Sequence, residues 1–211
     1  MKSLVLSEDL KNLLQKRAQN PISFGELVDT AGDRAFGIIF LILAFPSALP
    51  IPATGISTPL GIAMFLLSLQ MMAGREQLWV PQKVRNLTLP FGAAEKMIRA
   101  LSWVLTLFEK ILRPRWLWLH QKNGRRITAF HIALLCIVMQ VPIPLTNTIP
   151  AAVIFIQALA LTEDDGLVGF LTNLLAVTVV TAYVIGFGAL LYLGFTSFDQ
   201  LFEWIRSEPQ G

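Results

Sequence analysis

The stretch PIPATGISTP, residues 50–59, interrupts a long apolar segment with three prolines and one glycine. An uninterrupted helix is not expected here, because proline lacks the backbone N–H and clashes with the preceding helical turn. The surrounding residues 35–73 contain no Asp, Glu, Lys or Arg. The sequence therefore predicts a helix that is broken inside an apolar environment.

The placement of charge predicts an integral membrane protein. The chain has 211 residues, of which 54% are hydrophobic and 15% are charged, and its mean hydropathy is +0.60. Residues 127–162 and 166–198 also lack Asp, Glu, Lys and Arg. Each of these segments is at least as long as the roughly 20 residues that cross a bilayer as a helix. This pattern excludes an ordinary soluble domain.

A second interruption, PIPLTNTIP at residues 142–150, indicates an internal repeat. Each unit also resumes an apolar run that contains one glutamine, Gln70 or Gln157. At a constant offset of 92 residues, the matched pairs are Gly32 and Gly124, Arg34 and Arg126, Pro50 and Pro142, Pro52 and Pro144, and Thr54 and Thr146.

The predicted fold is an all-α integral membrane protein with two internal repeats, amphipathic helices and one long transmembrane helix. Each repeat is a proline-broken helical hairpin, either re-entrant or short-spanning. Its limbs of about 11–15 residues extend roughly 16–22 Å as helix, less than the hydrocarbon thickness of about 30 Å. The expected segments are an amphipathic amino-terminal helix at 1–21, the first repeat at 22–80, a basic amphipathic segment at 81–123, the second repeat at 124–165, the transmembrane helix at 166–196 and a polar tail at 197–211.

The basic segment between the repeats predicts the orientation. Residues 74–126 hold eleven of the seventeen Lys and Arg residues and only three acids. By the positive-inside rule, this segment is expected on the cytoplasmic side. If the stretch 92–120 crosses the membrane, the repeats are inverted; if it lies on the surface, they are parallel. Membrane topology and contacts with lipid headgroups account for the basic charge, so no nucleic-acid partner is expected.

Catalytic and metal-binding patterns are not found in the sequence. Cys136 is the only cysteine, which excludes an intramolecular disulfide and a cysteine metal cluster. There is no nucleophile–base arrangement, phosphate-binding glycine loop or zinc-ligand spacing. We therefore expect no enzyme activity, no cofactor and no metal. His131 is either a proton-responsive group or, as we favour, a helix-packing residue. Residues 164–166 are interpreted as a turn that begins the long helix.

The two broken centres form the predicted binding site. Irregular backbone at membrane depth requires burial in protein or a watery cavity, so the breaks are expected to share a polar pocket. Helix starts at Pro59 and Pro150 would present N–H groups to an anion, and limb ends near Phe45 and Gln140 would present carbonyls to a cation. Ser57 or Thr58, and Asn147 or Thr148, are candidate caps. The candidate substrate-binding residues are Arg34, Pro50, Pro52, Thr54, Gly55, Ser57, Thr58, Gln70, Arg126, Gln140, Pro142, Pro144, Thr146, Asn147 and Gln157.

Simpler interpretations of these residues stay open. Thr and Asn side chains can satisfy the backbone groups that a proline frees, without any ligand. Arg34 and Arg126 are either anchors at helix ends or contacts for a phosphate.

Five motifs in a fixed order resemble a known family. They are GDRAFG (32–37), PIPATGISTPLG (50–61), LQMMAGREQLWVP (69–81), PIPLTNTIPA (142–151) and LTEDDGL (161–167). Together they resemble the ExoD family of bacterial exopolysaccharide-synthesis-associated membrane proteins, from about residue 22 to residue 200. The resemblance implies a protein of the bacterial inner membrane that is linked to exopolysaccharide production. It implies no catalytic residues, and the second unit has Gly-Arg-Arg where the first has Gly-Asp-Arg.

Two functions remain after this reasoning. The first is transport-like handling of a small anion, another ion or a lipid-linked phosphate at a pocket formed by the two PIP breaks. The alternative is a non-transporting scaffold or regulator of a polysaccharide synthase complex. Membrane lipids are expected partners in both, and the short limbs are compatible with a homodimer.

Overall fold

The computed structural model describes residues 22–49, 57–89, 121–140 and 147–207, together with single positions between 92 and 118. The predicted helix at 1–21 and the two PIP segments at 50–56 and 141–146 lie outside the described residues. Most of the predicted amphipathic segment 92–120 also lies outside them.

The described part of the chain is mainly helical, as predicted. Within it, two strands of two residues each are the only β-structure. The elements in order are β1 (Ile22–Ser23), α2 (Phe24–Ala31), the 3₁₀ turn η1 (Gly32–Arg34), α3 (Ala35–Ala48), α4 (Ser57–Met72), α5 (Gln82–Arg85), β2 (Thr88–Leu89), α7 (Lys122–Val138), α8 (Thr148–Glu163) and α9 (Gly166–Ser207).

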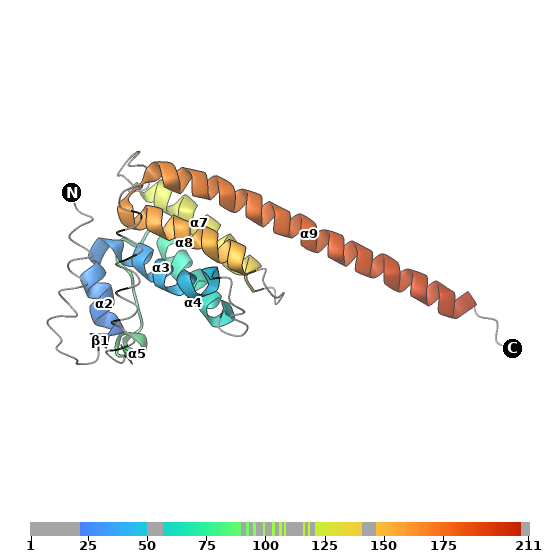
Figure 1. The fold of residues 1–211 in the computed structure, drawn as a ribbon, viewed down its shortest axis with the longest axis horizontal. Helices are drawn as coiled ribbons and strands as arrows, with labels where there is room; N and C mark the ends of the chain where they lie inside the picture. Colours follow the sequence, from blue (N-terminus) through green and yellow to red (C-terminus); the bar gives the residue numbers. More distant parts are fainter. Residues whose placement is uncertain are drawn as a thin grey trace.

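The helices α3, α4, α7 and α8 form a bundle. Each of them packs mainly against a helix that is distant in the sequence, and not against the next helix along the chain. α3 packs mainly against α8, and α4 packs mainly against α7. The first part of α9 lies along α7 and α8 (Figure 1). α3 is apolar on all sides and is the central helix of the core, with Ile38, Phe40 and Leu41 fully buried.

A glycine permits the close approach of α3 and α8. A Cβ added to Gly37 would lie 3.1 Å from the carbonyl oxygen of Ala158 and would overlap Thr162 Oγ1. Any larger residue at this position would therefore push the two helices apart.

Several contacts bring one set of helix ends together at what we call the charged end of the bundle. Arg34, before α3, lies beside Asp164, which follows α8. Arg126, near the start of α7, lies over Gly74, which follows α4. α3, α4, α7 and α8 therefore all begin or end at the charged end, which is defined by these four residues.

The opposite end of the bundle, which we call the break end, carries the helix ends that flank the two PIP segments. Ser47 near the end of α3 donates a hydrogen bond to Ser57 at the start of α4, with 3.3 Å between the two Oγ atoms. Gln140 after α7 packs against α4, because a Cβ on Gly61 would lie 2.5 Å from its Nε2 atom. The residues flanking both PIP segments are thus on the same end of the bundle.

The lengths and starts of the helices follow the proline pattern with one difference. α3 continues through Pro46 to Ala48, three residues beyond the limb end expected at Phe45. Pro46 lies in the last turn, where the hydrogen bond that it removes interrupts little of the helix. Pro59 and Pro150 lie in the first turns of α4 and α8, as predicted. The four bundle helices contain 14–17 residues, or about 21–26 Å.

The long apolar helix that the sequence predicts is α9, which has 42 residues. Its segment Gly166–Gly194 is the one helix among the described residues that is long and apolar enough to cross a membrane. α3, α4 and α8 are shorter apolar helices. α9 extends far beyond the bundle (Figure 1), and every residue from 184 to 194 is exposed.

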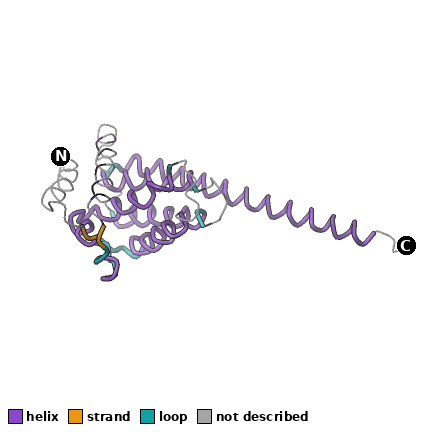
Figure 2. Tube along the Cα trace, turned by 60° about the horizontal axis from the view of Figure 1, so that its bottom comes forward, coloured by secondary structure: helices purple, strands orange, loops and turns teal. Residues whose placement is uncertain are grey.

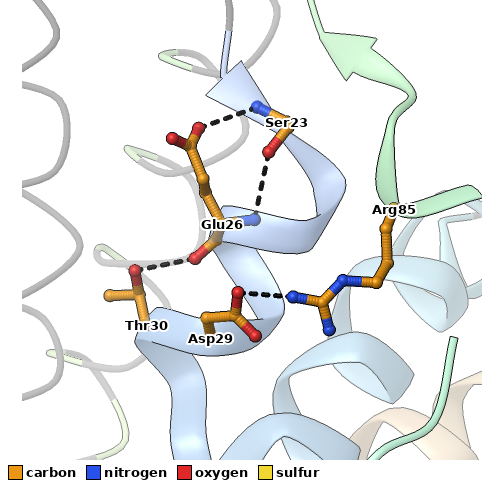
Figure 3. Close-up of polar contacts among 5 residues, drawn as sticks. All are labelled: Ser23, Glu26, Asp29, Thr30 and Arg85. Carbon is orange, nitrogen blue, oxygen red and sulfur yellow. Dashed lines mark hydrogen bonds and ion pairs between the residues drawn. The ribbon is translucent and has the colours of Figure 1, made fainter. Parts of the chain in front are cut away.

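A small polar unit joins the start of the described chain to the segment after α4. Ser23 and Glu26 form a capping box at the start of α2, in which each side chain accepts a hydrogen bond from the backbone N–H of the other (Figure 3). Arg85 of α5 bonds Asp29 of α2, with 2.6 Å between Nη2 and Oδ2. β1 pairs antiparallel with β2, and Figure 2 shows both strands at the end of the molecule away from the carboxyl-terminal end of α9.

Candidate functional site

The predicted binding residues that the structure describes do not gather at one place. Pro50, Pro52, Thr54, Gly55, Pro142, Pro144 and Thr146 lie outside the described residues. The others divide between the two ends of the bundle: Arg34, Gln70 and Arg126 at the charged end, Ser57, Thr58, Gln140 and Asn147 at the break end, and Gln157 between them. α3 alone separates these ends by about 21 Å, so one small ligand does not contact both sets.

Arg34 lies at the carboxyl terminus of α8. Its Nη2 atom is 3.9 Å from Oδ2 of Asp164, and the two side chains are 18% and 23% exposed. Asp164 ends α8 in the left-handed conformation, with φ of 57°. A guanidinium at this place complements both the carboxylate and the partial negative charge of the helix end.

Arg126 lies in the corresponding place on α4. Gly74 follows α4 with φ of 80°, and its N–H donates to the carbonyl of Met71. A Cβ on Gly74 would lie 2.9 Å from Nη2 of Arg126. Each of the two matched arginines therefore lies at the carboxyl-terminal end of a helix from the other half of the bundle.

The two matched glutamines have different environments. Gln70 lies near the end of α4, where its Oε1 accepts a hydrogen bond from the backbone N–H of Trp79 at 3.1 Å, and this bond is exposed. Gln157 is fully buried in the middle of α8. Gln70 therefore orders the turn after α4, whereas Gln157 belongs to the interior of the bundle.

The first helix start at the break end is only partly polar. Ser57 is buried and accepts the hydrogen bond from Ser47, whereas Thr58 is exposed. We expected the carboxyl end of α7 to present free carbonyls to a cation, but several of these carbonyls already accept hydrogen bonds within the protein. Those of Leu135 and Ile137 accept backbone hydrogen bonds, and Gln140 Nε2 donates to the carbonyl of Cys136 at 3.2 Å.

The second helix start carries an unsatisfied polar group. Asn147 occupies the cap position of α8, but its side chain makes no capping hydrogen bond. Its Oδ1 atom is buried and has no hydrogen-bond partner among the described residues. The Asn147 side chain, at the edge of the second PIP segment, can therefore accept a further hydrogen bond.

A line of buried polar side chains crosses three helices. Gln157 of α8 donates from Nε2 to Asn173 Oδ1 of α9 at 2.8 Å, and Asn173 Nδ2 donates to Thr128 Oγ1 of α7 at 3.0 Å. Gln157 and Thr128 are fully buried, and Asn173 is 6% exposed. Burying a polar group in such apolar surroundings is unfavourable unless it is hydrogen-bonded, and polar residues inside membrane helices are often functional.

Our sequence reasoning missed Thr128 and Asn173. Asn173 is the only Asn or Gln in the charge-free run of residues 166–198, and this isolated amide is the signal that could have identified it. Thr128 carries no comparable signal, because threonine is common in apolar helices.

A groove of about 660 Å³ lies next to this polar line, between α7 and α9. Trp118 at its edge donates from Nε1 to the carbonyl of Gly166 at 2.7 Å. His131 also lines the groove, and its imidazole lies close to the backbone of Ile127 and to the side chain of Asn173. The residues that line the groove are Trp116, Trp118, Ile127, His131, Phe170, Asn173, Leu174 and Val177.

The start of α9 confirms the turn predicted at residues 164–166. Asp165 Oδ1 accepts hydrogen bonds from the N–H groups of Leu167 and Val168, at 3.1 and 3.2 Å. The carboxylate therefore caps the helix and complements its dipole. Asp165 therefore has a structural role at this turn.

Comparison with known proteins places these features in a family. A family model described as "Exopolysaccharide synthesis, ExoD" matches residues 6–186. The chain is 36% identical to the uncharacterized protein slr1875 of Synechocystis sp., over 98% of both chains. It is 30% identical to Protein ExoD of Rhizobium meliloti, over 87% of this chain and 78% of that protein. No solved structure matches. The chain belongs to the ExoD family.

Proposed function

We propose that this protein of the bacterial inner membrane handles a lipid-linked phosphate or a small anion during exopolysaccharide synthesis. Membership of the ExoD family supports the link with exopolysaccharide synthesis. The apolar span Gly166–Gly194 and the three shorter apolar helices support a membrane location. The substrate and the transport-like mechanism are our inference from the arrangement of the helices.

The observation that carries the proposal is the reciprocal packing of the two hairpins. α3 packs against α8, and α4 packs against α7, so the first helix of each unit contacts the second helix of the other. Arg34 lies at the end of α8, and its matched residue Arg126 lies at the end of α4. This reciprocity supports two repeats that pack as equivalent units.

The packing also supports a site between the two PIP segments. Both hairpins begin and end at the charged end, and both PIP segments follow helices of about 21–26 Å. If the charged end lies at the cytoplasmic surface, the PIP segments lie deep in a hydrocarbon layer about 30 Å thick. Irregular backbone at that depth is stable only when protein or water satisfies it, which favours a shared polar pocket around Thr54 and Thr146.

Cysteine accessibility tests this site directly. Single cysteines replace Thr54 or Thr146 in a Cys136→Ala background, and Leu66→Cys is the control on an exposed apolar position of α4. We expect a membrane-impermeant thiol reagent to label positions 54 and 146, but not position 66, and a bound substrate to slow this labelling. Failure of both sites to react would contradict the proposal, as would reconstituted protein that moves neither anions nor polyisoprenyl phosphate.

A scaffold for a polysaccharide synthase is the second candidate function. It is favoured by residues 184–194 of α9, which are all exposed although this stretch is strongly apolar. This function requires no water-filled break. Unreactive cysteines at positions 54 and 146, together with loss of exopolysaccharide when residues 184–194 are replaced by a different apolar sequence, would support it.

A further inference from the structure

We infer that the charged end of the bundle lies among the phospholipid headgroups of one leaflet, where both hairpins enter and leave the membrane. Both hairpins are then re-entrant, and α9 alone among the described helices reaches the opposite surface. This arrangement rests on the membrane location proposed above, but it depends neither on the substrate nor on a pocket at the breaks. It is supported by the distribution of charge, by the tryptophans and by the apolar length of α9.

Charge separates the two ends of the bundle. Residues 35–74 and 127–162, which include both PIP segments and every helix end at the break end, contain no Asp, Glu, Lys or Arg. At the charged end, by contrast, Lys122 Nζ lies 3.9 Å from Glu76 Oε1, and both side chains are well exposed. Ionised side chains are stable in water or among headgroups and costly in hydrocarbon. The charged end therefore suits the membrane surface, and the break end suits the membrane interior.

Tryptophan side chains occur at the charged end as well. Trp118 Nε1 donates a hydrogen bond to the carbonyl of Gly166, the first residue of α9, at 2.7 Å. Trp79 follows α4, where its backbone N–H bonds Gln70, and its side chain is 57% exposed with the Arg75 guanidinium carbon 5.9 Å from the ring centroid. No tryptophan occurs in the charge-free residues around the break end. Because tryptophan is enriched at the level of the headgroups, its distribution marks the charged end as the membrane boundary.

The sides of the bundle between its two ends are suited to hydrocarbon. Ile62, Leu66 and Leu69 follow one another on the same face of α4, and Phe130 and Ile137 lie on α7. All five side chains are between 42% and 55% exposed. A row of exposed apolar side chains is unfavourable in water, whereas lipid tails solvate it. The bundle is therefore immersed in the membrane up to the charged end.

The apolar length of α9 distinguishes re-entrant hairpins from spanning ones. α9 begins at the charged end, and Tyr183, about 26 Å further along it, still packs against the core. Residues 184–194 then continue the helix for about 16 Å, are all exposed and carry no charge (Figure 1). If the break end reached the opposite membrane surface, this apolar stretch would stand in water. Its burial in hydrocarbon requires the break end to lie inside the membrane, short of that surface.

The lengths of the helices agree with this arrangement. The four bundle helices extend about 21–26 Å, less than a hydrocarbon thickness of about 30 Å. The span Gly166–Gly194 measures about 43 Å, enough to join the two headgroup layers of a bilayer about 40–45 Å thick in total. With the charged end at the cytoplasmic surface, the carboxyl-terminal end of α9 therefore lies on the periplasmic side.

Sided labelling of single cysteines in the full-length protein tests the course of α9. Each cysteine is introduced into a Cys136→Ala background, at Gln77 or Asn123 at the charged end and at Ser207 at the end of α9. A membrane-impermeant maleimide is applied to spheroplasts and to inside-out membrane vesicles. We expect positions 77 and 123 to react only in the vesicles and position 207 only in the spheroplasts. Reaction of all three positions from one side would overturn the arrangement, and the reverse pattern would overturn the cytoplasmic placement of the charged end.

Spin labels measure whether the hairpins stop inside the membrane. Leu49 and Ile149 flank the two PIP segments and are 37% and 55% exposed, and Val184, which follows Tyr183 on α9, is a 64% exposed control. The ratio of collision rates with oxygen and with a water-soluble nickel complex rises with depth in the bilayer. We expect this ratio at positions 49 and 149 to match that at position 184 and to exceed that at positions 77 and 123 several-fold. Ratios at 49 and 149 as low as at the charged end would mean that the hairpins span the membrane.

Cysteines at positions 54 and 146 keep this test separate from that of the proposed pocket. If positions 77, 123 and 207 label as expected while 54 and 146 stay unreactive, the pocket is refuted and the re-entrant arrangement is retained. If 54 and 146 react from the spheroplast side, the re-entrant arrangement is refuted although a watery site remains. Reaction of 54 and 146 in the inside-out vesicles alone supports both.

Discussion

The close contact between α3 and α8 makes Gly37 the most informative position for testing the fold. A Cβ at Gly37 would overlap Thr162 Oγ1 and would lie 3.1 Å from both the carbonyl oxygen of Ala158 and the backbone nitrogen of Thr162. Two of these atoms are backbone, so a rotamer change cannot clear the space. Gly186 of α9, with nothing within 4 Å of its Cβ position, is the matched control.

The pair of substitutions isolates the cost of this contact. Alanine is favoured over glycine by about 0.5–1 kcal/mol in a helix interior, and this gain is common to Gly37→Ala and Gly186→Ala. Overpacking at position 37 opposes it by about 1–3 kcal/mol. We therefore expect Gly37→Ala to be less stable than Gly186→Ala by about 1–3 kcal/mol, or roughly 2–12 °C in Tm for a chain of this size.

Thermal unfolding of the purified variants in one detergent measures this difference. Adding Thr162→Ala to Gly37→Ala removes the overlapping hydroxyl and should restore part of the lost Tm, although the backbone contacts remain. Equal Tm values for Gly37→Ala and Gly186→Ala would refute the packing of α3 against α8. Because the reciprocal pairing of the hairpins depends on that packing, the same result would also remove the main support for equivalent repeats.

Three further predictions concern other contacts. Asn173→Leu removes both interhelical hydrogen bonds of the buried polar line, each of which contributes about 0.6–1.7 kcal/mol. We therefore expect a lower Tm, and Asn173→Gln should not fully restore it. An unchanged Tm would show that these two bonds add no stability. Gly74→Ala forces a non-glycine residue to a φ of 80° and toward Arg126, so stability should fall by about 1–2 kcal/mol, whereas a neutral effect in denaturant unfolding would contradict the described turn. Arg85→Ala removes a partly exposed ion pair with Asp29 and should lower the free energy of unfolding by only about 0.2–1 kcal/mol. It should also speed hydrogen exchange in residues 82–89. Unchanged exchange there would mean that the ion pair does not hold this segment.

The sequence predicted the helices better than their partners. Charge-free runs and first-turn prolines located α4 and α8, because proline at a helix start has a direct backbone cause. The chain could not reveal that α3 packs against α8, since apolar faces of similar composition can pair within a hairpin or between hairpins. That choice depends on fine contacts such as Gly37 against Thr162, which no periodicity encodes.

The candidate site was likewise only partly predictable from the sequence. Arg34 and Arg126, which the sequence comparison matched, have comparable positions in the structure, at the ends of α8 and α4. Grouping them with the PIP residues overlooked the length of the helices between them. The polar line through Asn173 was missed because its members come from three helices and become neighbours only on folding.

The unequal lengths of α9 and the bundle have a consequence for the membrane itself. The apolar span Gly166–Gly194 has 29 residues and measures about 43 Å, well above a hydrocarbon thickness of about 30 Å. A helix with such a mismatch tilts, or thickens the bilayer around it. Because α7 and α8 pack on the first part of α9, they would tilt together with it. If α9 spans the bilayer as proposed, membrane thickness would therefore set the depth at which the two hairpins end.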